Sequence, residues 1–371
     1  MLQKKLKILG IIAEYNPFHN GHRWQLDQAK QIVNPDLTVV ILGGNYTQRG
    51  EMSVLRREDK VKISLSYGVD LVVGIPFLAN IQSVKQFALG SIQVAKKIGV
   101  THLVFGSEHP EFPYLEKSAE FLASGFAKNP SIKIPSENYA NNLEHDFAKF
   151  NFSLKEPNHL LGFYYALAAN ELNYHVKFVP LKRRKIGGSS SKIRSKLLEK
   201  DFEGLKNLVP SESYRYLKNT KIYKFKDCTF KLMKAKLILT ENDLLMDTFL
   251  LPEELLRRSQ KYINQATSYD EFVHLVKTKR YTLSRIKRVY LYLLLGINHT
   301  ANDDLNSVEI WGFNSKGQSY LSQIKNDIQF ITNPRKDDFK NSKSFCIEAR
   351  ANGFYDFIMD TKPSKLVIER E

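Results

Sequence analysis

An apolar run that leads into a polar turn and then into a helical pattern constrains this chain most. Residues 6–9 read LKIL, and residues 10–22 continue as GIIAEYNPFHNGH. Beyond the turn, apolar residues recur at helical rather than alternating spacing, at Trp24, Leu26, Ala29 and Ile32. Asn16-Pro17 marks the turn itself. The pattern predicts a strand, a tight loop and a helix, with His19-Asn20-Gly21-His22 at the loop end and the first helical turn.

The two histidines stand where the start of a helix favours an anion. A helix N-terminus presents unpaired N–H groups and a partial positive charge, so it attracts phosphate. Imidazoles three residues apart on a helical turn reach the same anion from one side, and Gly21 removes a side chain where a nucleotide would approach closely. The alternative is a buried strand with two incidental surface histidines. The combination of strand, proline loop, glycine and both histidines favours a phosphate site.

Length and composition exclude several other classes of protein. With 371 residues, the chain is long enough for two or three domains with substantial cores. No apolar run approaches the roughly 20 residues that a membrane span needs, and the first residues contain no signal-peptide core. Cys228 and Cys346 are far apart in the sequence and give neither a metal motif nor a disulfide framework. We therefore expect a cytoplasmic protein.

The positive charge is concentrated in one segment. The formal net charge of the chain is +16, and residues 181–290 contain 26 Lys and Arg against 12 Asp and Glu, a net of +14. A lysine-rich composition on solvated helices would be the plain explanation. Concentration in one segment favours a polyanionic partner instead. Nucleic acid is the first candidate and a membrane surface the second.

Strands and helices alternate through the first 200 residues. Continuous apolar runs predict buried strands at residues 36–43 and 70–76. Two further strands are predicted at residues 101–108 and 175–181. Helical patterns are predicted at residues 56–67 and 83–97, from 157 to about 171, and twice within 113–150. Strands that alternate with helices indicate a parallel sheet built from βαβ units, so the predicted fold class is α/β.

Two predicted strand ends and one helix start provide candidate ligand contacts, and open α/β sheets bind ligands beyond the carboxyl ends of their strands. Residues 44–51 form a polar loop whose Gln48 and Arg49 would contact substrate or pyrophosphate, with a solvated loop as an equal alternative. Gly106 lies beside the expected nucleotide cleft or is a simple turn glycine. Asn158 stands at a helix start, where capping is the stronger expectation and contact with adenine or ribose the other.

A second segment with phosphate chemistry follows the strand at 175–181. Residues 182–194 read KRRKIGGSSSKIR, a basic run and two glycines before three hydroxyls. Hydroxyls and backbone N–H groups at a helix start suit phosphate, and Lys192 or Arg194 would add charge. The alternative is a Gly/Ser linker with an N-cap. We take Ser191 and Arg194 as the candidate residues of this segment.

The pattern changes after about residue 200. Helices are predicted at residues 222–239, 253–266, 269–279 and 282–295, with basic and aromatic residues interleaved around their ends. Four basic side chains cluster beside Tyr281, where phosphate contact and base stacking could combine: Lys279, Arg280, Arg285 and Arg288. A strand at 308–313 and a helix at 317–324 then close the chain. The predicted organisation is a catalytic α/β domain at 1–200, a helical basic domain at 201–300, and a small αβ region at 301–371.

His19-Asn20-Gly21-His22 resembles the H-x-G-H signature of the nucleotidylyltransferase superfamily. The longer string at residues 14–22, EYNPFHNGH, is similar to that of the bacterial tRNA(Met) cytidine acetate ligase family. Residues 44–51, 105–108, 157–158 and 182–183 match that family in order and spacing. Residues 188–194 resemble the second superfamily signature, I-S-S-T-x-x-R, with Gly188 in place of Ile and Ser191 in place of Thr.

The resemblance implies an activity and a set of contacts. The family uses ATP to convert acetate to acetyl-adenylate and pyrophosphate, then acetylates the wobble cytidine of elongator tRNA(Met) to N4-acetylcytidine. From their clustering beside Tyr281 we expect the four basic residues there to contact the tRNA, and because no acidic cluster offers a metal site, we expect Mg²⁺ to be carried by the triphosphate. The resemblance itself implies catalytic roles for His19, His22, Ser191 and Arg194. It implies that ATP contacts Ile12, Ala13, Glu14, Tyr15, Asn16, Pro17, Phe18, His19, Asn20, Gly21, His22, Arg23, Trp24, Gln25, Gly106, Asn158, Arg183 and Arg184.

Two other classes of function remain open from the sequence. A small-molecule adenylyltransferase of the pantetheine-phosphate or nicotinate-nucleotide type would explain the H-x-G-H but leave the basic helical segment without a role. A non-enzymatic RNA-binding protein would retain an inactive nucleotide fold, although His19, His22 and the hydroxyl segment are intact. Pyrophosphate release that depends on acetate would separate all three. The expected partners are ATP, acetate and elongator tRNA(Met), with no membrane, and the oligomeric state is open.

Overall fold

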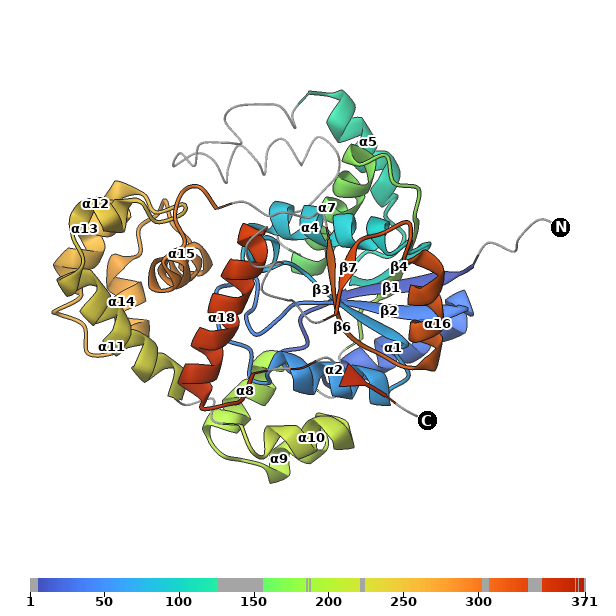
Figure 1. Cartoon of the computed structure of the whole chain (residues 1–371), viewed down its shortest axis with the longest axis horizontal. Coiled ribbons are helices and arrows are strands. Elements are labelled where there is room, and N and C mark those ends of the chain that lie inside the picture. Colours follow the sequence, from blue (N-terminus) through green and yellow to red (C-terminus); the bar gives the residue numbers. More distant parts are fainter. Residues whose placement is uncertain are drawn as a thin grey trace.

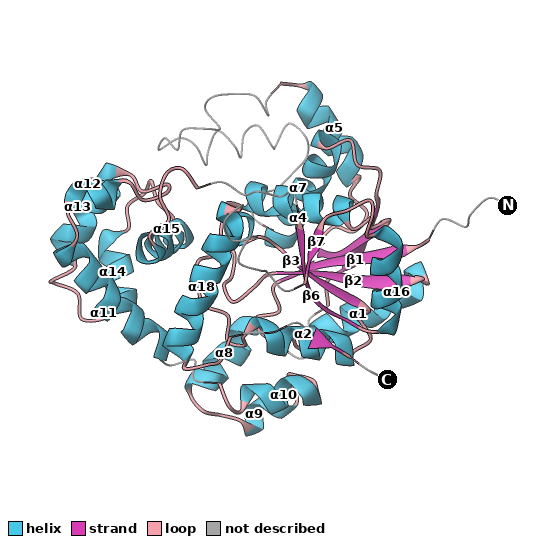
Figure 2. Ribbon diagram, in the orientation of Figure 1, coloured by secondary structure: helices cyan, strands magenta, loops and turns pink. Residues whose placement is uncertain are grey.

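The computed structural model describes residues 6–125, 156–184, 186, 188–220, 224–301, 307–332, 342–363, 365 and 367–369. Its strands form one sheet in the order β5-β4-β1-β2-β3-β6-β7, with β8 paired to β6 (Figure 1 and Figure 2). The strands are β1 Ile8–Ala13, β2 Leu37–Leu42, β3 Leu71–Gly74, β4 His102–Ser107, β5 Lys177–Lys182, β6 Val308–Phe313, β7 Phe330–Ile331 and β8 Val367–Ile368.

The strands from β5 to β3 are all parallel, as the alternation of strands and helices predicted. Strand β1 is the central one of these five parallel strands, and its Ile11 pairs with Val40 of β2 and Val104 of β4. The helices that connect and cover these strands are α1 Asn20–Val33, α2 Arg57–Ser66, α3 Phe77–Asn80, α4 Val84–Lys97, α5 Tyr114–Ala123 and α7 Pro157–Glu171. The second helix expected within 113–150 falls outside the described residues.

Each face of the sheet has its own apolar core, because successive side chains of a strand point to opposite faces. One core joins Val39 and Ile41 of β2 to residues of α4 and α7. The other joins Val40 and Leu42 to residues of α1 and α2. In α1 the buried stripe is Leu26, Ala29 and Val33, whereas Ile32, which we expected to share it, is 58% exposed. The α-helical period of 3.6 residues brings Val33, not Ile32, onto the face of Leu26 and Ala29.

The C-terminal region completes this sheet and does not form one of its own. Strand β6 pairs antiparallel with β3, with Phe313 opposite Leu71. The expected strand at 308–313 and the helix near 317–324 are confirmed as β6 and α16, which spans Ser315–Ile324. The division at residues 200 and 300 stays a proposal about domains, but in the sheet the last part of the chain belongs with the first.

The region after residue 200 is helical, as expected. Its helices are α8 Ser190–Leu198, α9 Glu203–Lys206, α10 Ser211–Leu217, α11 Lys224–Leu239, α12 Asn242–Met246, α13 Glu253–Tyr262, α14 Tyr269–Val276 and α15 Leu283–Leu295. Helices α11 to α15 share an apolar core of their own, which includes Met233, Phe272 and Tyr290. A long helix that we did not expect, α18 (Lys343–Met359), packs against α3, α11 and α15, and so joins the helical region to the sheet (Figure 1).

Among the described residues, every helix is too short or too polar to cross a lipid bilayer.

Candidate active site

The turn that follows β1 is fixed by its own buried side chains. Tyr15 and Phe18 are 2% and 1% exposed and pack edge to face, with ring centroids 4.8 Å apart. The Asn16 side-chain oxygen accepts a hydrogen bond of 2.8 Å from the backbone N–H of Val54. These side chains therefore hold the turn against the core, and any contact of Tyr15, Asn16, Pro17 or Phe18 with a nucleotide is limited to their backbone.

His19 and His22 cap the helix that the turn introduces. Nδ1 of His19 accepts a hydrogen bond of 3.1 Å from the backbone N–H of Gly21, and Nδ1 of His22 accepts one of 3.3 Å from the backbone N–H of His19. The two rings stack with centroids 3.7 Å apart. Because both Nδ1 atoms are acceptors, the proton of each neutral ring lies on Nε2. Each histidine therefore has an Nε2–H donor that its cap leaves unused.

Burial keeps both imidazoles neutral. It lowers the pKa of His19 to about 4, with a further contribution from the charge of Arg183. Burial, the neighbouring His19 and Arg183 hold the pKa of His22 well below its ordinary value. At neutral pH the pair is therefore a set of two uncharged donors at the positive end of α1, which is suited to an anion.

The structure gives Gly21 a further role beside the nucleotide approach that we expect there. A Cβ at this position would lie 2.9 Å from Cε1 of His19 and 3.4 Å from the carbonyl oxygen of Ile186. The absent side chain therefore makes room for the capping ring of His19 and for the segment after β5. The close approach that excludes a side chain is made by the protein itself.

The hydroxyl segment lies against the same turn. Ser189 caps α8 by accepting a hydrogen bond of 3.3 Å from the backbone N–H of Lys192. Arg194 donates one of 2.9 Å to the backbone carbonyl of Asn16 and one of 3.4 Å to the hydroxyl of Ser191. The two signature segments, which are far apart in the sequence, thus meet at the carboxyl end of β1.

Glu108 connects two of the residues proposed to contact ATP. Its Oε1 accepts a hydrogen bond of 2.7 Å from the side chain of Asn158 and lies 3.5 Å from Nη1 of Arg183. Its Oε2 accepts one of 2.9 Å from the backbone N–H of His159. Burial opposes its ionisation, but these hydrogen bonds and the Arg183 charge hold the pKa of Glu108 below its ordinary value. Asn158 is not the N-cap that we expected: Glu156 has that position, and Asn158 turns its amide to Glu108.

The remaining residues of the predicted nucleotide site border the same edge of the sheet. The Arg184 guanidinium lies 5.4 Å from the ring centroid of Trp24. Gly106 pairs with Leu181 in the sheet, and a Cβ there would lie 3.9 Å from Cγ of Arg183. The others form the end of β1 or the first turns of α1: Ile12, Ala13, Glu14, Asn20, Arg23 and Gln25. Of these, Arg23 points away from the cap, over the ring of Tyr67 at 5.1 Å.

Lys60, which we did not predict as a site residue, is buried beneath the carboxyl ends of the strands near the histidines. Lys60 of α2 is 1% exposed, and its Nζ donates to the carbonyl oxygens of Glu14, Gly43 and Gly44 at 3.0, 2.7 and 2.6 Å. Burial lowers its pKa to about 7. Lysine on a helix normally indicates a solvated face, and the residues one turn away include Arg56, Arg57 and Ser64, so the local pattern could not indicate this role.

The loop after β2 is buried rather than solvated. Asn45, Tyr46 and Thr47 are 1%, 2% and 5% exposed. The Gln48 side chain donates to the backbone carbonyl of Gln82, and its backbone N–H donates to the Glu14 carboxylate. Gln48 therefore builds the site, whereas Arg49 is exposed and stays a candidate for substrate contact.

The four basic residues expected to bind tRNA do not share one environment. Lys279 is exposed, and Arg280 forms an ion pair of 3.0 Å with Glu254. Arg285 lies over the ring of Tyr281 at 5.0 Å, and Arg288 is half-buried against the loop after β2. Tyr281 is only 7% exposed, so it is not the base-stacking platform that we expected. Its apolar ring fills the core of the helical region instead.

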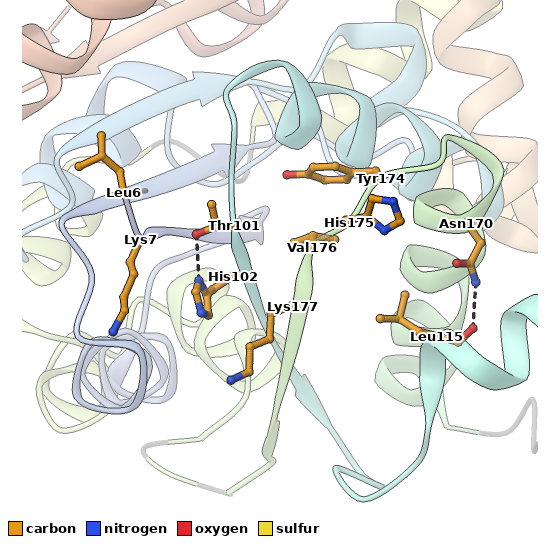
Figure 3. Close-up of a pocket in the computed structure, with 10 residues that line it drawn as sticks. All are labelled: Leu6, Lys7, Thr101, His102, Leu115, Asn170, Tyr174, His175, Val176 and Lys177. Carbon is orange, nitrogen blue, oxygen red and sulfur yellow. Dashed lines mark hydrogen bonds between the residues drawn. The ribbon is translucent and has the colours of Figure 1, made fainter. Parts of the chain in front are cut away.

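A separate hollow of about 510 Å³ lies at the amino ends of β1, β4 and β5, at the opposite edge of the sheet from the histidines (Figure 3). Its wall includes Lys7, His102, His175 and Lys177, with Thr101 bonded to the His102 ring at 2.9 Å. Ligands of parallel sheets bind at the other edge. The hollow is therefore no part of the candidate active site.

Sequence comparisons place the whole chain in one family. The family model described as HIGH Nucleotidyl Transferase matches residues 6–369. A tRNA(Met) cytidine acetate ligase of Lactobacillus helveticus is 31% identical over 95% of this chain and 97% of its own length. The protein of the same name from Limosilactobacillus reuteri is 31% identical over 94% of this chain and 95% of its own length. This chain belongs to the tRNA(Met) cytidine acetate ligase family. It is an enzyme of the nucleotidyl transferase type.

Two solved structures have the same fold as this chain. The crystal structure of Thermotoga maritima TmcAL bound with alpha-thio ATP matches with a TM-score of 0.82 and 25% sequence identity, over 99% of this chain and 100% of that one. The apo form I structure of the same protein matches with a TM-score of 0.81. The match extends through the helical region and α18, so these parts belong to the architecture of the family.

Proposed function

We propose that this chain uses ATP to activate acetate as acetyl-adenylate and transfers the acetyl group to the wobble cytidine of elongator tRNA(Met), forming N4-acetylcytidine. The observation that supports this proposal most strongly is the neutral, Nδ1-capped pair His19 and His22 at the N-terminus of α1. Membership of the tRNA(Met) cytidine acetate ligase family supplies the substrates.

In the first step, a carboxylate oxygen of acetate forms a bond to the α-phosphorus of ATP, and the bond from that phosphorus to the leaving pyrophosphate breaks. Negative charge accumulates on the non-bridging and leaving oxygens. The Nε2–H groups of His19 and His22 would donate to these oxygens without adding charge. Arg183, Arg194 and the helix N-terminus would provide the positive field. Preorganised donors of this kind need no rearrangement during the reaction.

In the second step, the exocyclic amine of cytidine attacks the acetyl carbon, the bond from that carbon to AMP breaks, and the amine loses a proton to solvent. The anhydride is already reactive, so this step depends mainly on holding the base against it. The helical region after residue 200 would hold the tRNA. Lys279, Arg280 and Arg285 are the candidate phosphate contacts on its surface.

The residues around the histidines do not provide a magnesium cage. In the described ranges, no three side chains of His, Cys, Asp and Glu gather in a way that could hold a metal ion. The Glu14 carboxylate, at the start of the turn that leads to the histidines, is half-buried and accepts a hydrogen bond from the backbone N–H of Gln48. We therefore propose that Mg²⁺ enters with ATP, held by the triphosphate, and assign no protein ligand to it.

Reconstitution with purified components tests this function. The protein, ATP, acetate and elongator tRNA(Met) should yield N4-acetylcytidine by nucleoside analysis, and pyrophosphate release should require acetate. Release with pantetheine phosphate or nicotinate nucleotide, and none with acetate, would favour a small-molecule adenylyltransferase instead.

A further inference from the structure

The loop between β2 and α2 (residues 43–56, here the β2–α2 loop) is enclosed by protein on two sides. Its residues Tyr46 and Met52 belong to an apolar core that they share with α3, α15 and α18. The Tyr46 hydroxyl donates a hydrogen bond of 2.7 Å to the backbone carbonyl of Ala351 in α18. The loop therefore lies where the helical region meets the sheet.

On one side the β2–α2 loop contacts the backbone and basic side chains of α15. Nζ of Lys287 lies 2.5 Å from Oε1 of Glu51, and Nη1 of Arg288 donates a hydrogen bond of 3.3 Å to the backbone carbonyl of Gln48. Between these contacts, Gly50 has a φ of +77°, and a Cβ there would lie 2.6 Å from the backbone nitrogen of Arg288. Only glycine suits this conformation and this approach, so the loop and α15 are fitted closely.

On its other side the β2–α2 loop contacts the turn that leads to the histidines. The backbone N–H of Gln48 donates a hydrogen bond of 2.5 Å to Oε1 of Glu14. Lys60 joins the Glu14 carbonyl to those of Gly43 and Gly44 at the base of the loop. Glu14 is followed directly by the buried turn that ends at His19. A single residue, Gln48, thus bonds to α15 through its carbonyl and to the nucleotide edge through its N–H.

We propose that Lys287 and Arg288 are positioning residues of the adenylation site: they fix the β2–α2 loop so that Gln48 holds Glu14, and with it the turn that orients His19 and His22. The proposal rests on the proposed function. It assigns different roles to two groups of basic residues that are close together in the sequence, within residues 279–288. Lys279 and Arg280 are exposed and Arg285 lies over the Tyr281 ring, whereas Lys287 and Arg288 serve the ATP step.

The partners of these two residues support this separation. The Lys287 side chain is 18% exposed and paired with Glu51, whereas Arg280, although paired with Glu254, keeps 48% of its side chain exposed. The half-buried Arg288 guanidinium is held by the Gln48 carbonyl, so it has little surface left for a phosphate. Burial and the neighbouring Arg285 lower the pKa of Arg288, so holding the charged guanidinium there costs free energy. The closely fitted contacts with the β2–α2 loop must offset that cost. If Lys287 and Arg288 bound tRNA phosphates, we would expect their side chains to be fully exposed.

The test is pyrophosphate exchange that depends on acetate, measured without tRNA. Arg288→Ala, Lys287→Ala and Glu51→Gln should each lower kcat about tenfold or more while KM for ATP changes little, because a small misplacement of catalytic groups is costly. Glu51→Gln is decisive because it removes a negative charge: it should not weaken tRNA binding, yet it should slow adenylation. Arg288→Lys should recover part of the rate. Arg257→Ala is the matched control, since it breaks an exposed ion pair of 3.1 Å with Glu253 in α13.

Normal exchange by Arg288→Ala and Glu51→Gln, with loss only of acetyl transfer to tRNA by Arg288→Ala, would overturn the proposal and assign Arg288 to the RNA surface. If the wild-type protein shows no exchange with acetate, the proposed function fails, and hydrogen exchange of the peptide 44–53 then decides. Arg288→Ala should speed exchange in that peptide relative to Arg257→Ala, with both variants folded by their melting temperatures. Equal protection of the peptide in both variants would overturn the proposal.

Discussion

The rings of His19 and His22 stack 3.7 Å apart while each Nδ1 accepts a backbone N–H of the same helical turn. The cap thereby decides the tautomer of both rings, and burial decides their charge. Helix geometry and phosphate chemistry therefore depend on the same two rings, the first through Nδ1 and the second through Nε2–H.

Replacing His22 should disable the chemistry and leave the fold intact. His22→Ala removes an Nε2–H donor to the transition state, so acetate-dependent pyrophosphate release should fall by at least about a hundredfold. His175→Ala, which removes an exposed histidine near the other edge of the sheet, should leave the rate unchanged. Near-normal release by His22→Ala would remove this residue from the mechanism.

His19 has a capping role that can be separated from its chemical one. His19→Ala should lower the free energy of unfolding by about 1 kcal/mol through loss of the N-cap. His19→Asn supplies another capping oxygen and should restore stability, measured by urea denaturation, without restoring pyrophosphate release. Recovery of activity in His19→Asn would contradict a role for the imidazole.

The low pKa of His19 makes stability depend on pH. Its pKa is about 4 in the folded protein and about 6.5 when unfolded, so between these values the unfolded chain binds more protons. The free energy of unfolding should therefore fall as the pH is lowered from about 6.5 to about 4. His19→Asn should reduce this dependence in urea denaturation at pH 7 and pH 5, while His175→Asn should not. An identical slope in wild type and His19→Asn would refute the assignment.

Lys60 should matter for stability far more than its neighbour Lys62. Lys60→Met leaves three buried carbonyl oxygens without a donor, which should cost at least about 3 kcal/mol of the free energy of unfolding. Lys62→Met on the same helix only breaks the pair of 2.6 Å with Glu58 and should cost less than about 1 kcal/mol. Similar losses in the two variants, measured by urea denaturation, would contradict this account.

Replacing Arg183 should affect ATP binding, whereas replacing Lys279, Arg280 and Arg285 should affect tRNA binding. Arg183→Ala should weaken ATP binding about tenfold in calorimetry without tRNA, the scale of one charge-assisted contact. The combined replacement of Lys279, Arg280 and Arg285 by Ala should spare acetate-dependent pyrophosphate release and abolish acetyl transfer. It should also flatten the salt dependence of tRNA affinity, because fewer counterions are released. Unchanged ATP affinity in Arg183→Ala would assign Arg183 to the RNA surface.

The sequence predicted best what depends on local patterns. Continuous apolar runs located β2 and β3, because a parallel strand is buried on both faces, and the motif at residues 10–22 located α1 and its cap. It could not predict that β6 pairs with β3, because strand order is decided by contacts distant in the sequence. Helix α18 was missed although Ile347, Ala351 and Tyr355 lie on one buried face of it. That face also contains the polar residues Ser344 and Glu348, while Phe357 is 69% exposed, so the sequence shows no clean apolar stripe.

Individual side chains were predicted by type but not always by role. An asparagine at a helix start has a usual local explanation as an N-cap, yet Asn158 bonds to Glu108. Gly21, in the first turn of α1, also leaves room for the backbone of Ile186 from the segment after β5. Tyr281 looked like a surface aromatic among basic residues and proved to be core. Partners that come from other segments of the chain decided each case.

The pairing of β6 with β3 also bears on how the protein is made. During synthesis, β3 emerges early, but the strand that covers its outer edge emerges only after the whole helical region has been translated. Until then the nascent chain presents an apolar strand with an open hydrogen-bonding edge, which is the kind of surface that recruits other strands. We expect ribosome-bound chains that stop before β6 to need chaperones, and released fragments of that length to aggregate.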